Sequence, residues 1–388
     1  MKDFSFGALT AGFVAVLVGY TSSAVIVFEA ARAAGATPAQ TASWMWALGI
    51  GMGLTTIVLS LRYRMPVLTA WSTPGAALLI TSVSGVPLAE IIGAFVLTGL
   101  AIVAIGLSGA FDRLMRRLPA ALAAAMLAGV LLRFGLEAFG AMKTQFTLVF
   151  AMFLVYLLGR RAWPRFAVPA ALAVGVTIAG ASGLFGVFEW PTGPTRPIFV
   201  APEFSWTAAV GIALPLLVVT MASQNVPGVA TLQAHGYAPP VSPVITTTGV
   251  ATVVLAPFGG YTFNLAAITA AICMGREAHP DPAQRYAAAV SAGVLYLFIG
   301  IWGGAVAGVF AAFPRELVLA IAGLALLGTI GNGLAAALKD EATREAALIT
   351  FVMTASGVTL WSVGSAFWGL VAGLMALAVR GWRRREAT

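Results

Sequence analysis

The chain has 388 residues, of which 60% are hydrophobic and only 9% are charged. Water-soluble domains carry about a quarter charged residues, so this composition excludes an ordinary soluble protein and indicates a polytopic protein of the inner-membrane type. The net charge is +8, but the basic residues are scattered over short loops, so we expect no nucleic-acid partner. The single cysteine, Cys273, excludes a disulfide framework.

Fourteen apolar segments follow one another along the chain, and we expect an all-α protein with fourteen transmembrane segments. Their approximate extents are 8–34, 43–61, 66–83, 88–110, 119–138, 145–159, 167–187, 206–235, 241–257, 262–275, 286–311, 315–335, 342–361 and 364–381. The third and tenth are shorter than the roughly 20 residues of a full crossing. The N-terminus lacks a small-residue cleavage site, so we interpret it as the start of the first span.

A polar linker with four prolines, Glu189 to Glu203, separates the first seven segments from the last seven. An odd number of crossings in each half puts the two halves in opposite orientations. We therefore expect an inverted repeat, with residues 1–190 as the first unit and 204–388 as the second.

One stretch occurs in both halves. Pro66 begins PVLTAWSTPGAALLITS, and Pro257, 191 residues later, begins PFGGYTFNLAAITAAIC. Each stretch predicts a short extended lead-in, an N-cap residue (Thr73 or Asn264) and a half-helix. Broken segments at matching places in two halves indicate a transporter's binding site, and a helix that starts inside the membrane favours an anion. The alternative is a pair of ordinary loops at the membrane edge.

A second echo supports the repeat. AAGATP ends the first segment at Ala33 to Pro38, and AHGYAP ends the eighth at Ala234 to Pro239, 201 residues later.

The charge distribution predicts the topology. With the N-terminus in the cytoplasm, 17 of the 22 basic residues fall on the inner side, as the positive-inside rule requires. Both termini are then cytoplasmic.

Polar side chains inside the apolar segments are the next candidates. Ser223, Gln224 and Asn225 precede Pro227, and buried amides are costly unless they find partners. They are candidate donors to a ligand, or alternatively they join helices to one another. Tyr20 and Phe28 offer a hydroxyl and rings in the first segment, with ordinary packing as the alternative.

Few ionisable residues lie within the segments. Arg133 and Glu137 are spaced i, i+4 and are expected to pair. Two histidines cannot form the usual His-rich metal site, and no G-x-x-x-x-G-K-[ST] motif is present. We therefore expect no enzyme activity and no cofactor, and transport that is driven by an ion gradient or is passive.

The chain resembles one family over essentially its whole length, and three stretches carry the resemblance. They are TASWMWALGIGMG from Thr41, LTAWSTPGAALL from Leu68 and YTFNLAAITAAICMGREAHPDPAQRY from Tyr261. They are similar to the benzoate:proton symporter family, BenE. The resemblance implies import of benzoate or a similar aromatic carboxylate with protons. It also implies the fold of nucleobase and SulP-type anion transporters, which has fourteen spans in two inverted repeats.

In that architecture a core domain (1–118 and 206–312) moves against a gate domain (119–190 and 313–388). The substrate lies between the starts of half-helices 3 and 10, beside spans 1 and 8. The implied substrate-binding residues are Tyr20, Phe28, Ser72, Thr73, Gly75, Gln224, Asn225, Thr262, Phe263, Asn264 and Leu265. We expect the carboxylate at the backbone N–H groups of Thr73 to Gly75 and Asn264 to Ala266, and the ring against Phe263, with Phe28, Tyr20 or Trp71 as further candidate walls.

Nucleobase relatives place acidic residues in spans 8 and 10, where this chain has Gln224 and Phe263. A carboxylate there would repel an anion, and its absence leaves the substrate carboxylate as a candidate proton carrier. The expected partners are a benzoate-like anion, protons, membrane lipid and a possible homodimer. Glycines such as Gly300 and Gly303 are expected along the moving boundary. The alternative function is a passive channel or exchanger for another small anion.

Overall fold

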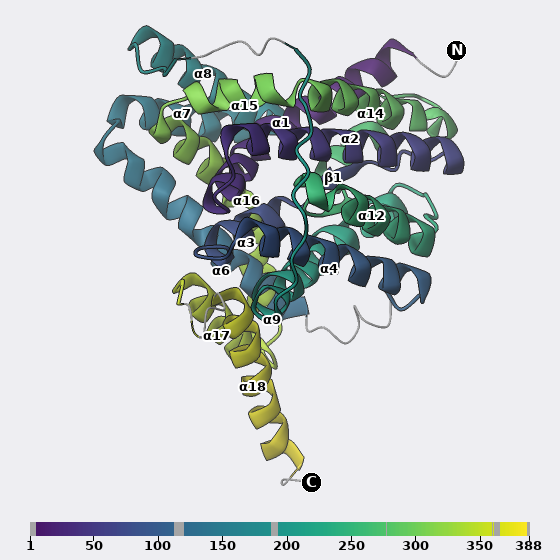
Figure 1. The fold of residues 1–388 in the computed structure, drawn as a ribbon, viewed down its shortest axis with the longest axis vertical. Coiled ribbons are helices and arrows are strands. Elements are labelled where there is room, and N and C mark those ends of the chain that lie inside the picture. Colours follow the sequence, from purple (N-terminus) through teal and green to yellow (C-terminus); the bar gives the residue numbers. More distant parts are fainter. Residues whose placement is uncertain are drawn as a thin grey trace.

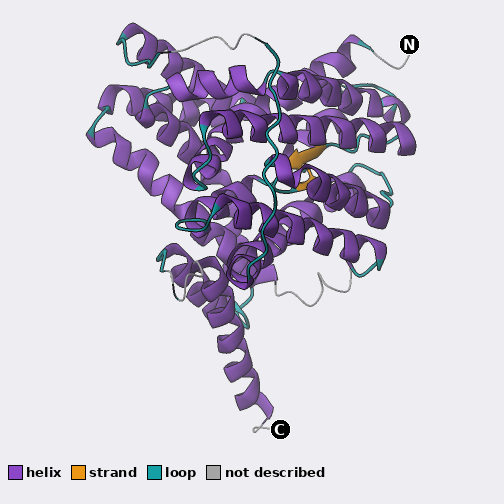
Figure 2. Cartoon of the chain, viewed as in Figure 1, coloured by secondary structure: helices purple, strands orange, loops and turns teal. Residues whose placement is uncertain are grey.

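The computed structural model describes residues 5–111, 120–187, 193–276, 278–358, 360 and 365–385, and within these residues the chain is almost entirely helical (Figures 1 and 2). The predicted boundary between core and gate at 118/119, the end of the first repeat at 190 and the first residues of the linker lie outside the described residues.

The described part of the first half contains seven α-helices, one strand and two 3-10 turns. In chain order they are α1 (Phe6–Ala33), α2 (Pro38–Tyr63), β1 (Thr69–Trp71), α3 (Thr73–Ser82), α4 (Leu88–Leu107), α6 (Ala120–Gly140), η1 (Ala141–Lys143), α7 (Phe146–Ala162), η2 (Pro164–Phe166) and α8 (Ala167–Ala181).

The second half begins with a helix that is interrupted twice by π-helical turns, η3 and η4. The elements are α9 (Trp206–Ala208), η3 (Ala209–Ala213), α10 (Leu214–Thr220), η4 (Met221–Asn225), α11 (Val226–Ala234), α12 (Val241–Leu255), η5 (Ala256–Phe258), β2 (Phe263–Leu265), α13 (Ile268–Met274), η6 (Pro282–Gln284), α14 (Tyr286–Ile301), α15 (Gly303–Ala312), α16 (Arg315–Leu338), α17 (Arg344–Ala355) and α18 (Ser365–Arg385).

Each of the fourteen predicted segments contains at least one helix. Among the described residues, seven helices are long and apolar enough to cross a membrane, and α1, bent by 41° between Tyr20 and Ser23, gives an eighth. Fourteen crossings therefore stay a prediction. The eleventh segment was predicted as one helix, but it is broken at Trp302 into α14 and α15.

The two lead-ins are extended, as predicted, and they pair with each other in the middle of the fold (Figure 2). β1 and β2 form an antiparallel pair in which Ala70 faces Asn264. The pairing continues beyond the strands, because Ser72 N–H donates to Thr262 O at 3.2 Å and Ala266 N–H donates to Leu68 O at 2.9 Å. The two-stranded sheet therefore joins the two broken segments through backbone hydrogen bonds.

Both predicted helix caps were wrong by a few residues. Ser72, not Thr73, caps α3, and its hydroxyl accepts from Gly75 N–H at 3.0 Å. Asn264 lies inside β2, and α13 starts only at Ile268, after Ala267 and without a side-chain cap. Strand pairing explains the second error, since it holds Leu265, the residue after the expected cap, in β2 and so delays the start of the helix.

The ends of α1 and α11 match, in agreement with the second sequence echo. Gly35 and Gly236 have φ values of +73° and +84°, which glycine adopts without strain. The residue after each glycine donates its N–H five residues back, Ala36 to Ala31 and Tyr237 to Leu232, at 3.0 Å in both cases. This is the Schellman arrangement of a helix C-terminus.

The helices contact one another in two sets. In one set α14 packs against α2 and α1, and α12 packs against α4; in the other, α6 packs against α16 and α17, and α7 packs against α8. Gly49 and Gly300 allow backbone contact between α2 and α14, since a Cβ added at Gly300 would lie 2.9 Å from Ile50 N. The glycines of the eleventh segment were expected at the moving boundary; instead Gly300 and Gly303 pack against α2, within the predicted core.

The described part of the linker runs as an extended strand-like segment across the first set of helices (Figure 1). Ile198 N–H donates to Ser43 Oγ at 2.9 Å, Val200 N–H donates to Pro257 O at 2.8 Å, and Glu203 N–H donates to Ala89 O at 2.9 Å. The described part of the linker is therefore hydrogen-bonded to α2, η5 and α4.

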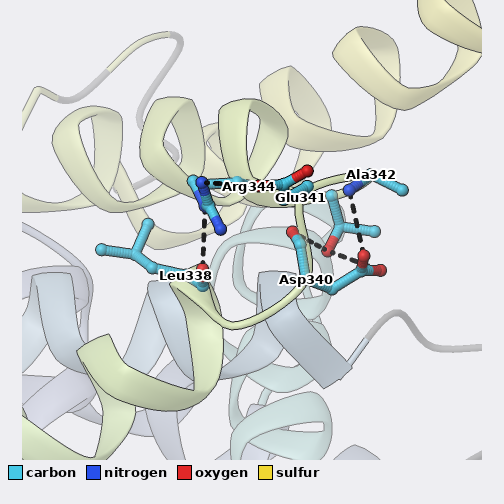
Figure 3. A network of polar contacts seen from close by, with 6 residues as sticks. Leu338, Asp340, Glu341, Ala342 and Arg344 are labelled. Carbon is cyan, nitrogen blue, oxygen red and sulfur yellow. Dashed lines mark hydrogen bonds and ion pairs between the residues drawn. The ribbon is translucent and has the colours of Figure 1, made fainter.

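Two polar contacts stabilise helices of the second set. Arg133 Nε and Glu137 Oε1 lie 2.7 Å apart, as predicted from their spacing, although both are solvent- or lipid-accessible. The turn between α16 and α17 is closed by Arg344, whose Nε donates to the terminal carbonyl of Leu338 at 3.0 Å, and by Asp340, which accepts from Ala342 N–H at 3.0 Å (Figure 3). The bond from Arg344 satisfies a carbonyl that the end of α16 leaves unpaired.

Candidate functional site

A cavity of about 920 Å³ lies between the two sets of helices. Its wall is formed by α1, β1, α3, η4, α11, α13 and α14 on one side and by α6, α7, α8 and α16 on the other. Of the eleven predicted site residues, Tyr20, Thr73 and Gln224 line this cavity. The cavity volume falls in the usual range for ligand sites.

The start of α3 reaches the cavity through Thr73 and Pro74. Proline has no N–H, the N–H of Gly75 is already bonded to Ser72 Oγ, and the N–H of Ala76 donates to Ser72 O at 2.8 Å. The donors left at this helix start are therefore the N–H and the hydroxyl of Thr73. The predicted backbone donors of the stretch Thr73 to Gly75 are therefore reduced to the N–H of Thr73 here.

Three aromatic rings, those of Tyr20, Trp71 and Tyr296, form one part of the cavity wall. The ring centroids of Tyr20 and Trp71 lie 4.7 Å apart in an edge-on arrangement, and those of Tyr20 and Tyr296 lie 6.0 Å apart. Trp71 is fixed by its Nε1–H, which donates to Ser23 Oγ at 3.0 Å. These rings come from α1, β1 and α14, so the fold positions them independently.

The Tyr20 hydroxyl has no hydrogen-bond partner among the described residues, although Tyr20 is only 8% exposed. Buried polar groups are nearly always bonded, and an unpaired one is costly. Tyr20 belongs to the cavity wall, but its hydroxyl is covered in this structure, so a ligand can bond to it only after a small side-chain shift.

The π-helical turn η4 brings Ser223 and Gln224 to the cavity. Pro227 follows this turn and removes the N–H that would close a regular helical bond, which favours the wider turn. The Gln224 side chain is oriented from behind by Asn264, whose Nδ2 lies 3.5 Å from Gln224 Oε1. Gln224 Nε2 is then the end of the amide that remains for a ligand, with the amide orientation assigned from this contact.

Other predicted site residues lie behind the wall and hold it in place. Asn225 Oδ1 accepts from Leu265 N–H at 2.9 Å and so ties η4 to β2. The Thr220 hydroxyl lies 3.2 Å from Ser72 Oγ and 3.4 Å from Thr262 Oγ1, which ties α10 to both broken segments. None of these side chains is exposed, so they support the site rather than line it.

Two predicted ring contacts lie elsewhere. Phe263 is fully buried against α2, where a Cβ at Gly51 would collide with its ring. Phe28 packs against Phe310 with ring centroids 4.9 Å apart. Neither belongs to the residues that line the cavity.

The described residues that line the cavity include no Asp or Glu. The basic side chains among them are Arg160 and His235. A cavity lined this way favours an anion over a cation. In the described ranges no group of three or more His, Cys, Asp or Glu residues is arranged to hold a metal ion.

Comparison with known proteins identifies the family. The family model described as "Benzoate membrane transport protein" (BenE) matches residues 2–379. The chain belongs to the BenE family. It is 40% identical over 375 residues to the benzoate membrane transport protein of Acinetobacter baylyi, covering 97% of this chain and 95% of that one. It is 53% identical over 365 residues to the inner membrane protein YdcO of Escherichia coli, covering 94% and 93%.

Solved structures show the fold of this BenE-family chain. The transmembrane domain of the cyanobacterial bicarbonate transporter BicA aligns with a TM-score of 0.59 at 13% identity, over 95% of this chain and 97% of that one. Murine Slc26a9 in the inward-facing state aligns with a TM-score of 0.62 at 14% identity, over 99% and 69%. The chain is thus a multi-pass membrane transporter with the SLC26/BicA-type fold, not an enzyme, and its family implies an anionic substrate.

Sequence reasoning missed Tyr296 as a site residue. A tyrosine in the middle of the apolar segment 286–311 is a weak signal, because such a residue usually packs between helices. Its place on the wall depends on the contact between α1 and α14, which no local pattern predicts.

Proposed function

We propose that this protein imports benzoate or a similar aromatic monocarboxylate across the inner membrane by proton symport, and that the 920 Å³ cavity is its substrate site. The observation that supports this most strongly is the composition of the cavity wall, which includes the rings of Tyr20, Trp71 and Tyr296 as well as Thr73 and Gln224. Such a wall offers an apolar face and hydrogen-bond donors a short distance apart. An aromatic carboxylate has the matching two ends.

The carboxylate binds at the start of α3. Thr73 supplies an N–H and a hydroxyl there, Gln224 and Ser223 supply side-chain donors from η4, and Tyr20 supplies its phenolic hydroxyl. The positive end of the α3 dipole adds roughly 0.3–1 kcal/mol, and more in a desolvated site. The start of α13, at Ala267 and Ile268, also lines the cavity.

The ring packs against Tyr20, Trp71 and Tyr296 instead of Phe263. Edge-to-face and offset arrangements of aromatic rings contribute about 0.5–1.5 kcal/mol beyond the buried area. A cavity of about 150 Å³ already holds benzene. The larger cavity here therefore leaves a passage beside the bound substrate.

The cavity opens toward the cytoplasm in this proposal. Arg160, His235 and Gly275 line it, and the positive-inside topology puts all three at the cytoplasmic ends of their segments. The structure then represents an inward-facing arrangement. Access alternates when the core (1–118 and 206–312) moves against the gate (119–190 and 313–388), carrying both broken segments together.

We place the coupled proton on the substrate carboxylate. The described lining offers no Asp or Glu, and His235 lies at the mouth rather than beside α3. A proton that crosses with the substrate carboxyl group needs no acidic side chain at the site.

Uptake by reconstituted vesicles tests this function. With an inward proton gradient, labelled benzoate should accumulate inside above its external concentration, and collapse of the gradient should release it. The alternative, a passive channel or exchanger for another small anion, predicts equilibration only, with no accumulation driven by protons.

A further inference from the structure

A second cavity, of about 340 Å³, lies on the outside of the substrate cavity. It is formed by α1, α8, α14, α15 and the residue that follows α15, Phe313, and these helices lie together in Figure 1. Apart from the hydroxyl of Tyr20, every lining side chain is a hydrocarbon. We call this cavity the outer groove.

The outer groove joins the membrane-facing surface. Phe13 at one rim is 55% exposed, and Val309 at the other is 38% exposed. In a helix bundle that crosses a bilayer, exposed apolar side chains of this kind face lipid tails. The groove is therefore a depression in the lipid-facing surface.

We propose that the outer groove binds one fatty acyl chain of a membrane phospholipid. Water is a poor occupant, because an ordered water needs two to four polar partners and the groove offers one hydroxyl. An empty groove would forfeit the dispersion contacts of all its wall atoms. Its volume is roughly twice that of a cavity that holds benzene, which suits a length of flexible chain.

The position of the groove makes this acyl chain a neighbour of the substrate. Tyr20 lines both cavities, so its side chain is within reach of an occupant of either one. Leu172 comes from α8, in the predicted gate, while Leu295 and Val306 come from α14 and α15, in the predicted core. The bound chain thus contacts both bodies at the boundary where the proposed motion occurs.

A photoreactive phospholipid tests the proposal without reference to transport. The full-length protein is reconstituted in vesicles that contain phosphatidylethanolamine with a diazirine in its acyl chain, irradiated and digested, and the labelled peptides are mapped. Peptides of α1 and α15 that line the groove should be labelled severalfold more than the lipid-facing surface of α12.

Two matched variants locate the label. Val309→Trp fills the rim of the groove and should reduce labelling of α1 and α15 severalfold. Val254→Trp adds the same bulk on α12, where Val254 is 60% exposed, and should leave that labelling unchanged. Both positions are exposed, so neither change overpacks the interior.

Three results would overturn the proposal. The first is equal labelling of the groove and α12, or labelling that Val309→Trp does not alter. The second is loss of the label when benzoate saturates the protein, which would make the groove a site for the aromatic acid. The third is a cross-link between two copies of the chain through Phe13 and Val309, which would make it a protein interface. The label reports only contact between lipid and protein, so this result can be interpreted even if the transport proposal fails.

Discussion

Replacement of Tyr20 by phenylalanine removes the one atom that best distinguishes this site from ordinary helix packing. Tyr20 lines the cavity, and its hydroxyl is buried without a partner among the described residues. The ring, with its contacts to Trp71 and Tyr296, remains in the variant. Any change in binding then reports the hydroxyl alone.

The expected loss follows from the strength of a hydrogen bond to a charged group. Such a bond contributes about 1.5–3 kcal/mol, and each 1.4 kcal/mol is a factor of ten in Kd, so benzoate should bind roughly 10- to 150-fold more weakly. The empty protein should not be destabilised, because the variant removes a buried polar group that lacks a partner, which otherwise costs about 1–3 kcal/mol. Affinity and stability should therefore change in opposite directions.

The assay is benzoate binding to the purified protein by calorimetry, with thermal unfolding in the same detergent. Tyr261→Phe is the matched control. The Tyr261 hydroxyl is also fully buried and unpaired, but it lies in a cluster with Trp44 and Phe95, away from the cavity. This control should keep its benzoate affinity. The reasoning fails if Tyr20→Phe binds benzoate within twofold of the original protein, or if both variants lose affinity equally.

Four further outcomes follow from the site and the fold. Gln224→Glu should weaken uptake at neutral pH through repulsion of the carboxylate and regain part of it as the pH falls and the new side chain becomes neutral; uptake by the original protein over the same pH range is the reference. Acetate should compete roughly 30-fold less well than benzoate, since burial of the ring contributes roughly 2 kcal/mol; equal competition would contradict an aromatic wall. Gly51→Ala should lower the thermal stability by about 1–3 kcal/mol because the new methyl group collides with Phe263, while Gly140→Ala, with open space around it, should not. A cross-link between α1 and α8 should stop transport whereas one between α3 and α13 should spare it, and a harmless α1–α8 cross-link would favour a channel.

The broken segments show how far the sequence alone predicts this site. The repeated proline, the extended lead-in and the short apolar run indicate two interrupted spans, and the structure confirms the lead-ins as β1 and β2. The helix starts were misplaced because a cap residue was sought next to each lead-in. Pairing of Ala70 with Asn264, residues 194 positions apart, extends β2 past the expected cap, and a local pattern contains no trace of such a partner.

The polar residues of segment 8 were identified, but their roles were not separable. Ser223, Gln224 and Asn225 are adjacent in sequence, yet the π-helical turn directs Gln224 to the cavity and Asn225 to the backbone of Leu265. In a regular helix these side chains would point in other directions than they do in the π-helical turn. The turn depends on Pro227 and on the hydrogen bonds around it, so the division of roles became visible only in three dimensions.

The aromatic wall was the least predictable part. Phe263 was predicted as the main ring contact, whereas its ring fills the space that Gly51 leaves on α2. Tyr20 and Trp71, which were predicted as further candidate walls, do line the cavity. Tyr296 was not considered, since its side chain reaches the cavity only where α14 crosses α1. Ring contacts between distant helices depend on tertiary packing, which hydrophobic patterns do not encode.

The position of a bound substrate analogue tests the central claim most directly. A structure of the protein with 4-iodobenzoate, whose iodine marks the end of the ring opposite the carboxylate, should place the carboxylate at Thr73 and Gln224 and the ring against Tyr20, Trp71 and Tyr296. An analogue bound in the outer groove, or in the cavity with the carboxylate turned away from the start of α3, would contradict the account.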